Sequence, residues 1–143
     1  MAEAALAKKS LPKINPIDQP YWQGAAAGKL LIQKCMNCRK LQFYPRPVCV
    51  DCFSGNLDWV EASGKGKIHS FTWVRVPRNP AFREEVPICY INVILEEGII
   101  MESRLVGRDV EKVKRGDRVK VAFQQTTSPE IKLPVFELEG SEF

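Results

Sequence analysis

The stretch CMNCRKLQFYPRPVCVDC, residues 35–52, decides the fold of this chain. It carries two C-x-x-C pairs, Cys35 with Cys38 and Cys49 with Cys52, separated by ten residues. Each pair predicts a tight knuckle with both sulfurs facing one point, and two knuckles complete a tetrahedral four-thiolate site. Zinc is the usual structural occupant of such a site, and iron is the alternative. Four protein ligands leave no open position for water, so we expect a structural metal and no metal-based catalysis.

The loop between the two pairs is shorter than the roughly 15 to 20 residues of common zinc-binding spacings, which indicates a compact, rubredoxin-like ribbon. A disulfide or a redox-active C-x-x-C motif is the alternative. Neither pair is expected between a strand and a helix, as a thioredoxin-like motif requires, and paired cysteines in a reducing compartment favour a metal. Cys89 lies apart from both pairs, and we expect a small buried strand residue there in preference to a reactive thiol.

Short elements are predicted on both sides of the cysteines. Residues 1–18 carry two prolines and little periodicity, which favours a flexible arm or an extended strap, and residues 18–28 predict a short helix that ends near Gly28. Strand patterns follow at residues 29–35, 41–44 and 57–62. We therefore expect an N-terminal arm and helix over residues 1–28 and a zinc ribbon over residues 29–63.

Residues 64–143 have a different sequence pattern, in which strand-like stretches are separated by short turns. Alternating or β-branched stretches predict five strands, at residues 67–76, 87–96, 99–105, 118–124 and 133–138. Glu96-Glu97-Gly98 is short enough for a hairpin turn. Five strands in so short a segment predict a Greek-key barrel of the oligonucleotide/oligosaccharide-binding (OB) type. The fold class is therefore mainly β, with a short N-terminal helix, a rubredoxin-like zinc ribbon and a C-terminal five-stranded OB-fold barrel.

The composition and the distribution of apolar residues indicate a globular protein without membrane-spanning or secretory segments. The chain of 143 residues is 45% hydrophobic and 27% charged, as in globular proteins. It has no apolar stretch of the roughly 20 residues that cross a bilayer. Its N-terminus mixes acidic and basic residues without the apolar core of a secretory signal. We therefore expect a cytoplasmic protein without a membrane association.

Catalytic residues are not apparent from the pattern. His69 is the single histidine, and a structural or surface role is the expectation for a histidine without a partner motif. The glutamate pairs at residues 84–85 and 96–97 are more typical of solvated carboxylates than of a general acid and base. The glycines around Lys65 lack the spacing of phosphate-binding loops. We assign no catalytic residue.

A basic and partly aromatic stretch is the candidate ligand surface. The net charge is only +4, but residues 64–83 hold five basic side chains and no acidic one, whereas residues 129–143 are net acidic. Core packing is the expected role of most aromatic residues here. A stacking and phosphate-binding surface is the alternative, because rings stack on bases and guanidinium groups pair with phosphates. Its candidate residues are Lys65, Lys67, Trp73, Arg75, Arg78 and Phe82.

The order of these features resembles a known family, the zinc-ribbon/OB-fold (DUF-type) proteins associated with acyl-CoA metabolism. Beyond the four cysteines, the resemblance rests on an ordered set of short motifs: Tyr21-Trp22, Gly28-Lys-Leu30, Pro45-Arg-Pro47, Trp59, Gly64-Lys-Gly66, Pro87, Glu97-Gly98 and Gly116-Asp117-Arg-Val119. The resemblance spans most of the chain. Taken one at a time, only the cysteine pairs are highly specific to a protein class. The resemblance implies the same helix, ribbon and barrel.

The resemblance also implies a partner. Members of this family look like accessory subunits of thiolase-like enzymes, including assemblies in which a small protein bridges an acetoacetyl-CoA thiolase and a hydroxymethylglutaryl-CoA synthase and helps to hold coenzyme A. Our first hypothesis is therefore a non-catalytic scaffold that binds coenzyme A or acyl-CoA and bridges enzymes of this type. The second hypothesis is a single-stranded nucleic-acid-binding OB-fold protein, whose affinity would fall steeply with salt. The balanced charge and the acidic tail weigh against it.

Overall fold

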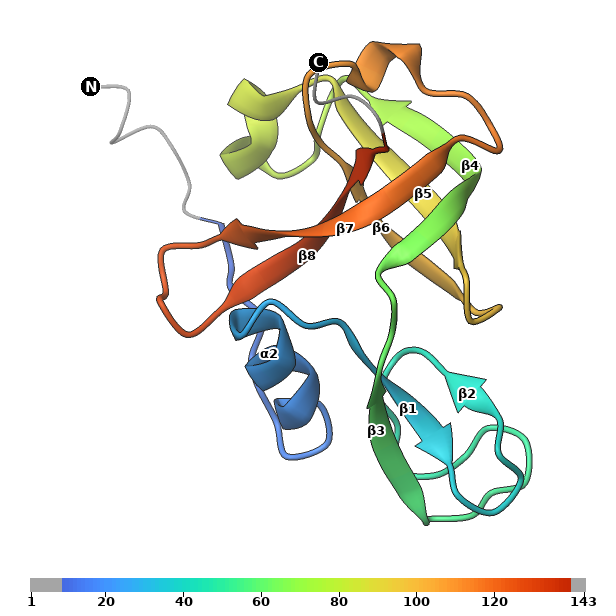
Figure 1. The fold of residues 1–143 in the computed structure, drawn as a ribbon. Coiled ribbons are helices and arrows are strands. Elements are labelled where there is room, and N and C mark those ends of the chain that lie inside the picture. The colour runs from blue at the N-terminus through green and yellow to red at the C-terminus, as the bar shows by residue number, and fades with distance from the viewer. Residues whose placement is uncertain (1–8, 140–143) are drawn as a thin grey trace.

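A computed structural model describes residues 9–139 of the chain, so residues 1–8 of the predicted arm and 140–143 of the acidic tail lie outside it. The elements are one helix, eight strands and two short 3-10 helices (Figure 1). In chain order they are α2 (Gln19–Ala26), β1 (Leu31–Cys35), β2 (Leu41–Gln42), β3 (Leu57–Glu61), β4 (Lys65–Val74), η1 (Pro80–Glu85), β5 (Ile88–Leu95), β6 (Ile100–Leu105), η2 (Val110–Lys112), β7 (Arg118–Gln125) and β8 (Lys132–Leu138). The predicted fold class is confirmed. The 3-10 helices were not predicted.

Helix α2 ends where the sequence predicts. Gly28 adopts a φ of 80°, a left-handed conformation that glycine tolerates without strain. Its N–H donates to the carbonyl of Ala25 at 3.0 Å, and the N–H of Lys29 donates to the carbonyl of Gly24 at 2.8 Å. This pair of bonds is the Schellman arrangement, which satisfies the last carbonyls of a helix. The chain therefore leaves the helix directly into β1.

Strands β1 to β3 form the ribbon sheet, in the order β2-β1-β3 and antiparallel throughout. The sheet lies below the barrel in Figure 1, with α2 beside it. The last ribbon strand ends at Glu61 and the first barrel strand begins at Lys65. We therefore keep the boundary between residues 63 and 64 as our proposal for the ribbon and barrel domains, with the other limits as predicted from the sequence.

The remaining five strands form a closed barrel in the order β4-β5-β6-β8-β7, with β7 pairing back onto β4. All pairings are antiparallel except that of β6 with β8, which is parallel and brings Leu105 opposite Phe136. The side chains of Phe136, Val93 and Val119 are fully buried inside the barrel. This arrangement confirms the predicted OB-type barrel.

A β-bulge changes which side chains of β4 face the core. The register of β4 against β5 shifts between Ile68 and Ser70, so His69 is an extra residue on β4. Because side chains alternate along a strand, one extra residue reverses the inward and outward positions beyond it. Gly66 and Ile68 face inward before the bulge, and Phe71 and Trp73 pack against the core after it. The bulge therefore turns Trp73 toward the core.

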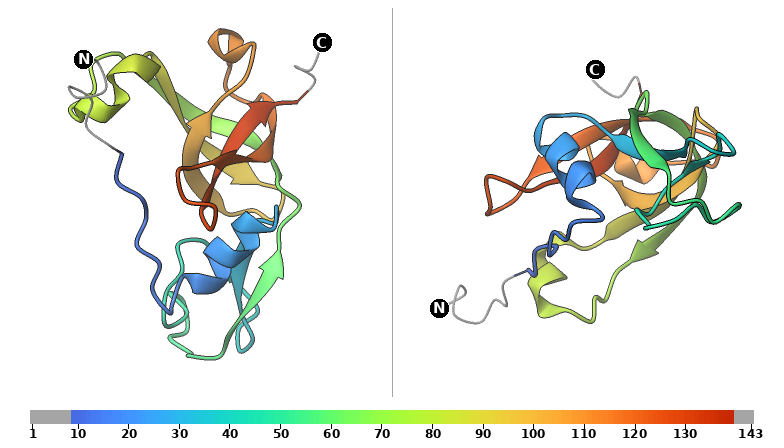
Figure 2. Two further views of the ribbon diagram at one scale, coloured as in Figure 1. Left: turned by 90° about the vertical axis from the view of Figure 1, so that its left-hand side faces the viewer. Right: turned by 90° about the horizontal axis from the view of Figure 1, so that it is seen from below.

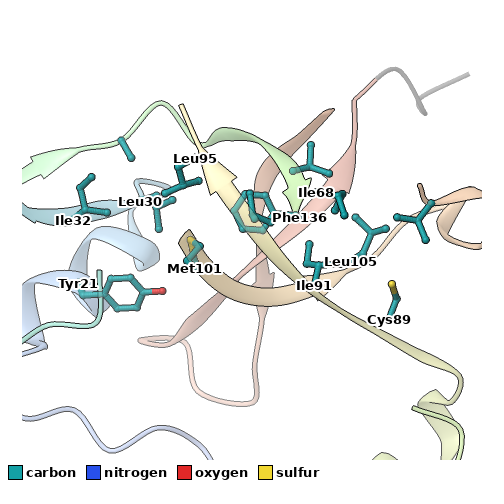
Figure 3. Close-up of a cluster of buried hydrophobic side chains, with 14 residues drawn as sticks. Tyr21, Leu30, Ile32, Ile68, Cys89, Ile91, Leu95, Met101, Leu105 and Phe136 are labelled. Carbon is teal, nitrogen blue, oxygen red and sulfur yellow. The ribbon is translucent and has the colours of Figure 1, made fainter. Parts of the chain in front are cut away.

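One hydrophobic core joins the helix, the ribbon and the barrel. Tyr21 of α2 and Leu30 and Ile32 at the start of the ribbon belong to the same buried cluster as Leu95 and Met101 of the barrel (Figure 3). The other views show α2 and the ribbon together on one end of the barrel (Figure 2). The ribbon is therefore fixed to the barrel by packing. Among residues 9–139, no helix has the length and apolar character needed to cross a bilayer.

We expect the glycine at position 66 to be required by close packing. A Cβ there would lie 2.5 Å from the carbonyl oxygen of Ile94 and 2.6 Å from a methyl carbon of Val93. The Gly66→Ala variant should lose about 2 kcal/mol of unfolding free energy, the usual effect of overpacking. Gly55→Ala is the matched control, because a Cβ there meets nothing within 4 Å. Urea denaturation followed by tryptophan fluorescence measures both, and equal midpoints for the two variants would contradict the packing.

Candidate metal centre and binding surfaces

The four predicted cysteine ligands meet at one point. Their Sγ atoms all lie within 4.8 Å of one another, with Cys35 and Cys52 at 3.5 Å and Cys38 and Cys49 at 3.6 Å. Four sulfurs about 2.3 Å from a tetrahedral zinc ion would be about 3.8 Å apart. The donor set and its spacing therefore fit a four-coordinate thiophilic metal. The four cysteines that the sequence predicts as metal ligands are therefore close together in the structure.

The two knuckles have the same backbone geometry. In the first, the N–H of Arg39 donates to the carbonyl of Cys35 at 2.8 Å, and in the second the N–H of Phe53 donates to the carbonyl of Cys49 at 3.0 Å. Arg39 and Phe53, the residues that follow each second cysteine, have positive φ values of 70° and 64°. A left-handed residue at this position turns the chain away, so that both cysteines of a pair face inward.

Hydrogen-bond donors point at the sulfurs and bias their ionisation. The amide of Asn37 donates to the Sγ of Cys52 at 3.5 Å, and this bond, with the backbone N–H of Ser54, lowers the pKa of Cys52 to about 6. Backbone N–H groups of residues 52 and 51 likewise lower the pKa of Cys49. The pKa of Cys38 is raised to about 12, since burial and bonds from the other thiols outweigh the lowering by the backbone of Lys40. Negative charges on four sulfurs this close together repel one another, which opposes the ionisation of all four thiols. A divalent cation would offset this repulsion and stabilise all four thiolates.

Two buried glutamines hold the second knuckle against the sheet. The Oε1 atom of Gln33 accepts the N–H of Arg46 at 3.0 Å, and that of Gln42 accepts the N–H of Val50 at 3.0 Å. Gln42 also donates to Gln33 at 2.8 Å. Both side chains are less than a tenth exposed. Their amides therefore accept hydrogen bonds from backbone N–H groups in and before the second cysteine pair. The only sequence signal for this role is that polar residues occupy inward positions of the strands.

The basic residues near the cysteines surround the centre without forming a second site. Lys40 pairs with Asp51, which raises the pKa of Lys40. Arg39 and Arg46 are exposed, and no ion pair within residues 9–139 engages them. They lie close enough in sequence to offset the negative charge of four thiolates around a divalent ion.

The residues predicted to bind a ligand form two separate groups. Lys65 and Lys67 lie at the start of β4, where they line a hollow of about 380 Å³ with Arg118. Trp73 lies near the other end of the same strand, beyond the bulge at His69. Arg75, Arg78 and Phe82 follow in the loop and in η1. The two lysines therefore lie at the start of β4, whereas the other four candidates lie at its end and in the segment that follows, and of these only Phe82 lines a groove.

A groove of about 1080 Å³ lies beside the second group. Its walls are η1, the ends of β6, β7 and β8, and the N-terminal strap, which we define as residues 9–17 and which runs along the side of the molecule from η1 to α2 (Figure 2). Glu85 is the central charge, because it pairs with Lys9 of the strap and accepts from Arg104 at 2.5 Å. The Nζ of Lys9 also lies 5.1 Å from the centre of the Phe82 ring. The sequence did not single out Lys9 or Arg104, and its expectation of solvated carboxylates at residues 84–85 is wrong for Glu85, which forms two ion pairs.

His69, Cys89 and Glu97, which the sequence analysis considered as reactive side chains, lie apart from the metal cluster in β4, β5 and the β5–β6 turn. His69 is exposed at the bulge, where its carbonyl accepts from the guanidinium of Arg115 at 3.1 Å. Cys89 is buried in β5, as the sequence predicts, and burial raises its pKa. Glu97 accepts the N–H of Ser63 at 2.8 Å and so ties the linker between ribbon and barrel to the β5–β6 turn.

Comparisons with known proteins match both parts of the chain. A family model described as the ChsH2 rubredoxin-like zinc ribbon domain matches residues 22–58, and one described as the ChsH2 C-terminal OB-fold domain matches residues 59–124. The chain is similar to a solved structure named Ltp2-ChsH2(DUF35) aldolase, with a TM-score of 0.79, 34% identity, and coverage of 90% of this chain and 98% of that one.

Two curated relatives have different lengths. A DUF35 domain-containing scaffold protein of Methanothermobacter thermautotrophicus is 33% identical over 64% of this chain and 69% of its own length. A probable enoyl-CoA hydratase alpha subunit of Thermomonospora curvata is 35% identical over 87% of this chain, but the match spans only 38% of that protein. The chain is therefore similar to about two thirds of a scaffold protein and to a smaller part of a longer protein named as an enzyme subunit.

We expect purified chain to hold one metal ion, and Cys49→Ser to lose it, because a neutral hydroxyl is a far weaker ligand than a thiolate for a thiophilic ion. Metal content after gel filtration, measured by plasma mass spectrometry, tests this. Cys89→Ala is the matched control, since Cys89 is buried outside the cluster and should leave the metal in place. Equal metal content in Cys49→Ser and in the unchanged chain would be incompatible with a four-thiolate site.

Proposed function

The chain belongs to the family of ChsH2-type (DUF35) proteins, built from a rubredoxin-like zinc ribbon and an OB-fold domain, and on this premise we propose that it is a non-catalytic accessory subunit of an acyl-CoA enzyme. The observation that carries this proposal is the closed metal centre. All four ligand positions of a tetrahedral ion would be taken by cysteine sulfurs, which leaves no place for water or substrate. The ion would therefore hold the ribbon in shape, and the protein would act through its surfaces.

The relatives support a partner that handles acyl-CoA. One is named a scaffold protein, one an enoyl-CoA hydratase alpha subunit, and the solved structure's name joins a ChsH2(DUF35) chain with an aldolase. A thiolase-like enzyme, alone or bridged to an enzyme of the hydroxymethylglutaryl-CoA synthase type, is our specific proposal for the partner. Zinc is our proposal for the metal, since it is the usual structural ion in four-thiolate sites and iron is the alternative.

We also propose that the chain helps to hold coenzyme A or an acyl-CoA at the second group of ligand residues. Arg75 and Arg78 are exposed in the loop before η1, and no ion pair within residues 9–139 engages either guanidinium. Guanidinium groups suit the phosphates of coenzyme A. Phe82 lines the neighbouring groove together with apolar side chains, the amides of Gln124 and Gln125, and four charged side chains, namely Lys9, Glu84, Glu85 and Arg104. Its size and mixed lining are those of small-molecule sites, and they suit a pantetheine arm.

Single-stranded nucleic acid is the second candidate. OB folds bind oligonucleotides on the outer face of their second and third strands, here β5 and β6. That face offers no unpaired basic side chain, because Arg104 is engaged by Glu85. Its other outward residues are Tyr90, Asn92, Ile94, Ile100 and Glu102. Oligonucleotide binding at low salt that equals or exceeds acyl-CoA binding would favour this second candidate.

Charge-reversal variants should show which end of the barrel binds coenzyme A. We expect Arg75→Glu combined with Arg78→Glu to weaken acetoacetyl-CoA binding about 100-fold or more, since charge-assisted bonds to phosphate contribute roughly 1.5–3 kcal/mol each and two are lost. Calorimetry with the chain in complex with its enzyme measures the affinity. The matched control is Lys65→Glu combined with Lys67→Glu, which changes the same charge at the opposite end of β4. A larger loss in this control would move the site to the lysines.

The accessory role itself is tested by purification. A tagged, full-length chain should co-purify with an acyl-CoA enzyme from its native host, and the reconstituted pair should run as one species in gel filtration. The isolated chain should not turn over acyl-CoA substrates. Turnover by the chain alone, or a chain that forms no complex with the enzymes it is tested against, would refute the proposal.

A further inference from the structure

Four of the apolar side chains exposed on the ribbon lie next to the metal ligands in the chain. Met36, Val48, Val50 and Phe53 are 38%, 39%, 54% and 75% exposed. Each is a direct chain neighbour of a cysteine of the cluster, next to Cys35, Cys49, Cys49 and Cys52 in turn. Because the four sulfurs lie within 4.8 Å of one another, these side chains all start from one small end of the ribbon. We call these four residues the metal tip.

Of the four residues of the metal tip, Phe53 gives the strongest indication of a role outside the fold. Its φ of 64° lies in the left-handed region, where a residue with a side chain is strained by about 1–2 kcal/mol and glycine is not. The knuckle needs this backbone conformation but makes little use of the ring, which is three-quarters exposed. Glycine would therefore serve the fold better than phenylalanine. A large exposed aromatic residue at a strained position indicates that its ring is used outside the fold.

The metal tip is also held rigid. The thiolates of both knuckles would be fixed by the ion, and Gln42 holds the N–H of Val50 at 3.0 Å. The N–H of Met36 donates to the carbonyl of Asn56 at 2.9 Å. Apolar side chains on a fixed backbone lose little conformational entropy on binding, which favours protein association.

Charges around the metal tip define the surface that fits it. The exposed guanidinium groups of Arg39 and Arg46 have no ion pair within the described part of the chain, and the carboxylate of Asp51 is engaged by Lys40. In a symmetric contact between two copies, the same patch faces itself, so unpaired arginines would meet. A different protein with carboxylates around an apolar surface would neutralise them instead.

We propose that the metal tip is the docking surface for the acyl-CoA enzyme, and that the enzyme offers an apolar patch rimmed by Asp or Glu side chains. This inference rests on the proposed accessory function and names the surface that performs it. The ion then has a second role beyond folding, since it presents Met36, Val50 and Phe53 in a fixed arrangement.

The Phe53→Gly variant tests the inference without damaging the fold. We expect its unfolding midpoint to equal or exceed that of the unchanged chain, because strain is removed, while its affinity for the co-purified acyl-CoA enzyme falls about 30-fold, as for a central aromatic anchor. Ile100→Ser is the matched control, since Ile100 is 48% exposed on the barrel. Its affinity should be unchanged. Biolayer interferometry with immobilised full-length chain measures both.

The outcomes distinguish this inference from the proposed function. If the unchanged chain and Phe53→Gly bind the enzyme equally, the metal tip is not the docking surface, but the accessory role stands. If Ile100→Ser alone loses affinity, docking occurs through the barrel face. If the unchanged chain dimerises in light scattering and Phe53→Gly is monomeric, a second copy is the occupant and the inference is overturned. If no acyl-CoA enzyme binds the unchanged chain, the accessory role fails as well.

Discussion

The convergence of four cysteine sulfurs on one point is the constraint on which the ribbon depends. Two knuckles from separate parts of the chain must present their sulfurs within 4.8 Å, although negative sulfurs repel one another without a cation. The backbone achieves this with the same turn twice, each closed by the N–H of a left-handed residue that donates to the carbonyl of the first cysteine. A ribbon with one two-residue strand has a thin core of its own, so metal binding and folding are coupled here.

The ribbon gains a fixed orientation because its core is continuous with that of the barrel. Tyr21 packs edge-on against Trp22 and Phe43, with ring centres 4.9 and 5.6 Å away, and burial raises its pKa. Tyr44 reaches from the ribbon to Glu102 of the barrel at 3.4 Å. The ribbon is therefore carried at a set angle to the barrel, and the end of β1 at Cys35 points away from the barrel (Figure 1). Such an arrangement suits a protein that positions other proteins.

The sequence was sufficient for the parts of the fold that follow from local chemistry. Cysteine spacing predicted the cluster, Gly28 predicted the end of α2, and alternating hydrophobic residues predicted the five barrel strands. It was insufficient where one residue changes the geometry of its neighbours. The bulge at His69 reverses the faces of β4, and so Trp73 packs against the core, although the sequence made it a candidate for a stacking surface. The roles of Gln33, Gln42 and Glu85 depend on contacts between distant segments, which no local pattern encodes.

The central claim is that the metal-held end of the ribbon contacts an acyl-CoA enzyme while the protein performs no chemistry itself. Hydrogen–deuterium exchange of the full-length chain, free and in complex with its enzyme, tests this most directly. The account predicts slower exchange on binding in peptides that cover residues 36–53, with little change across β5 and β6. Protection confined to β5 and β6, with residues 36–53 exchanging as in the free chain, would contradict it.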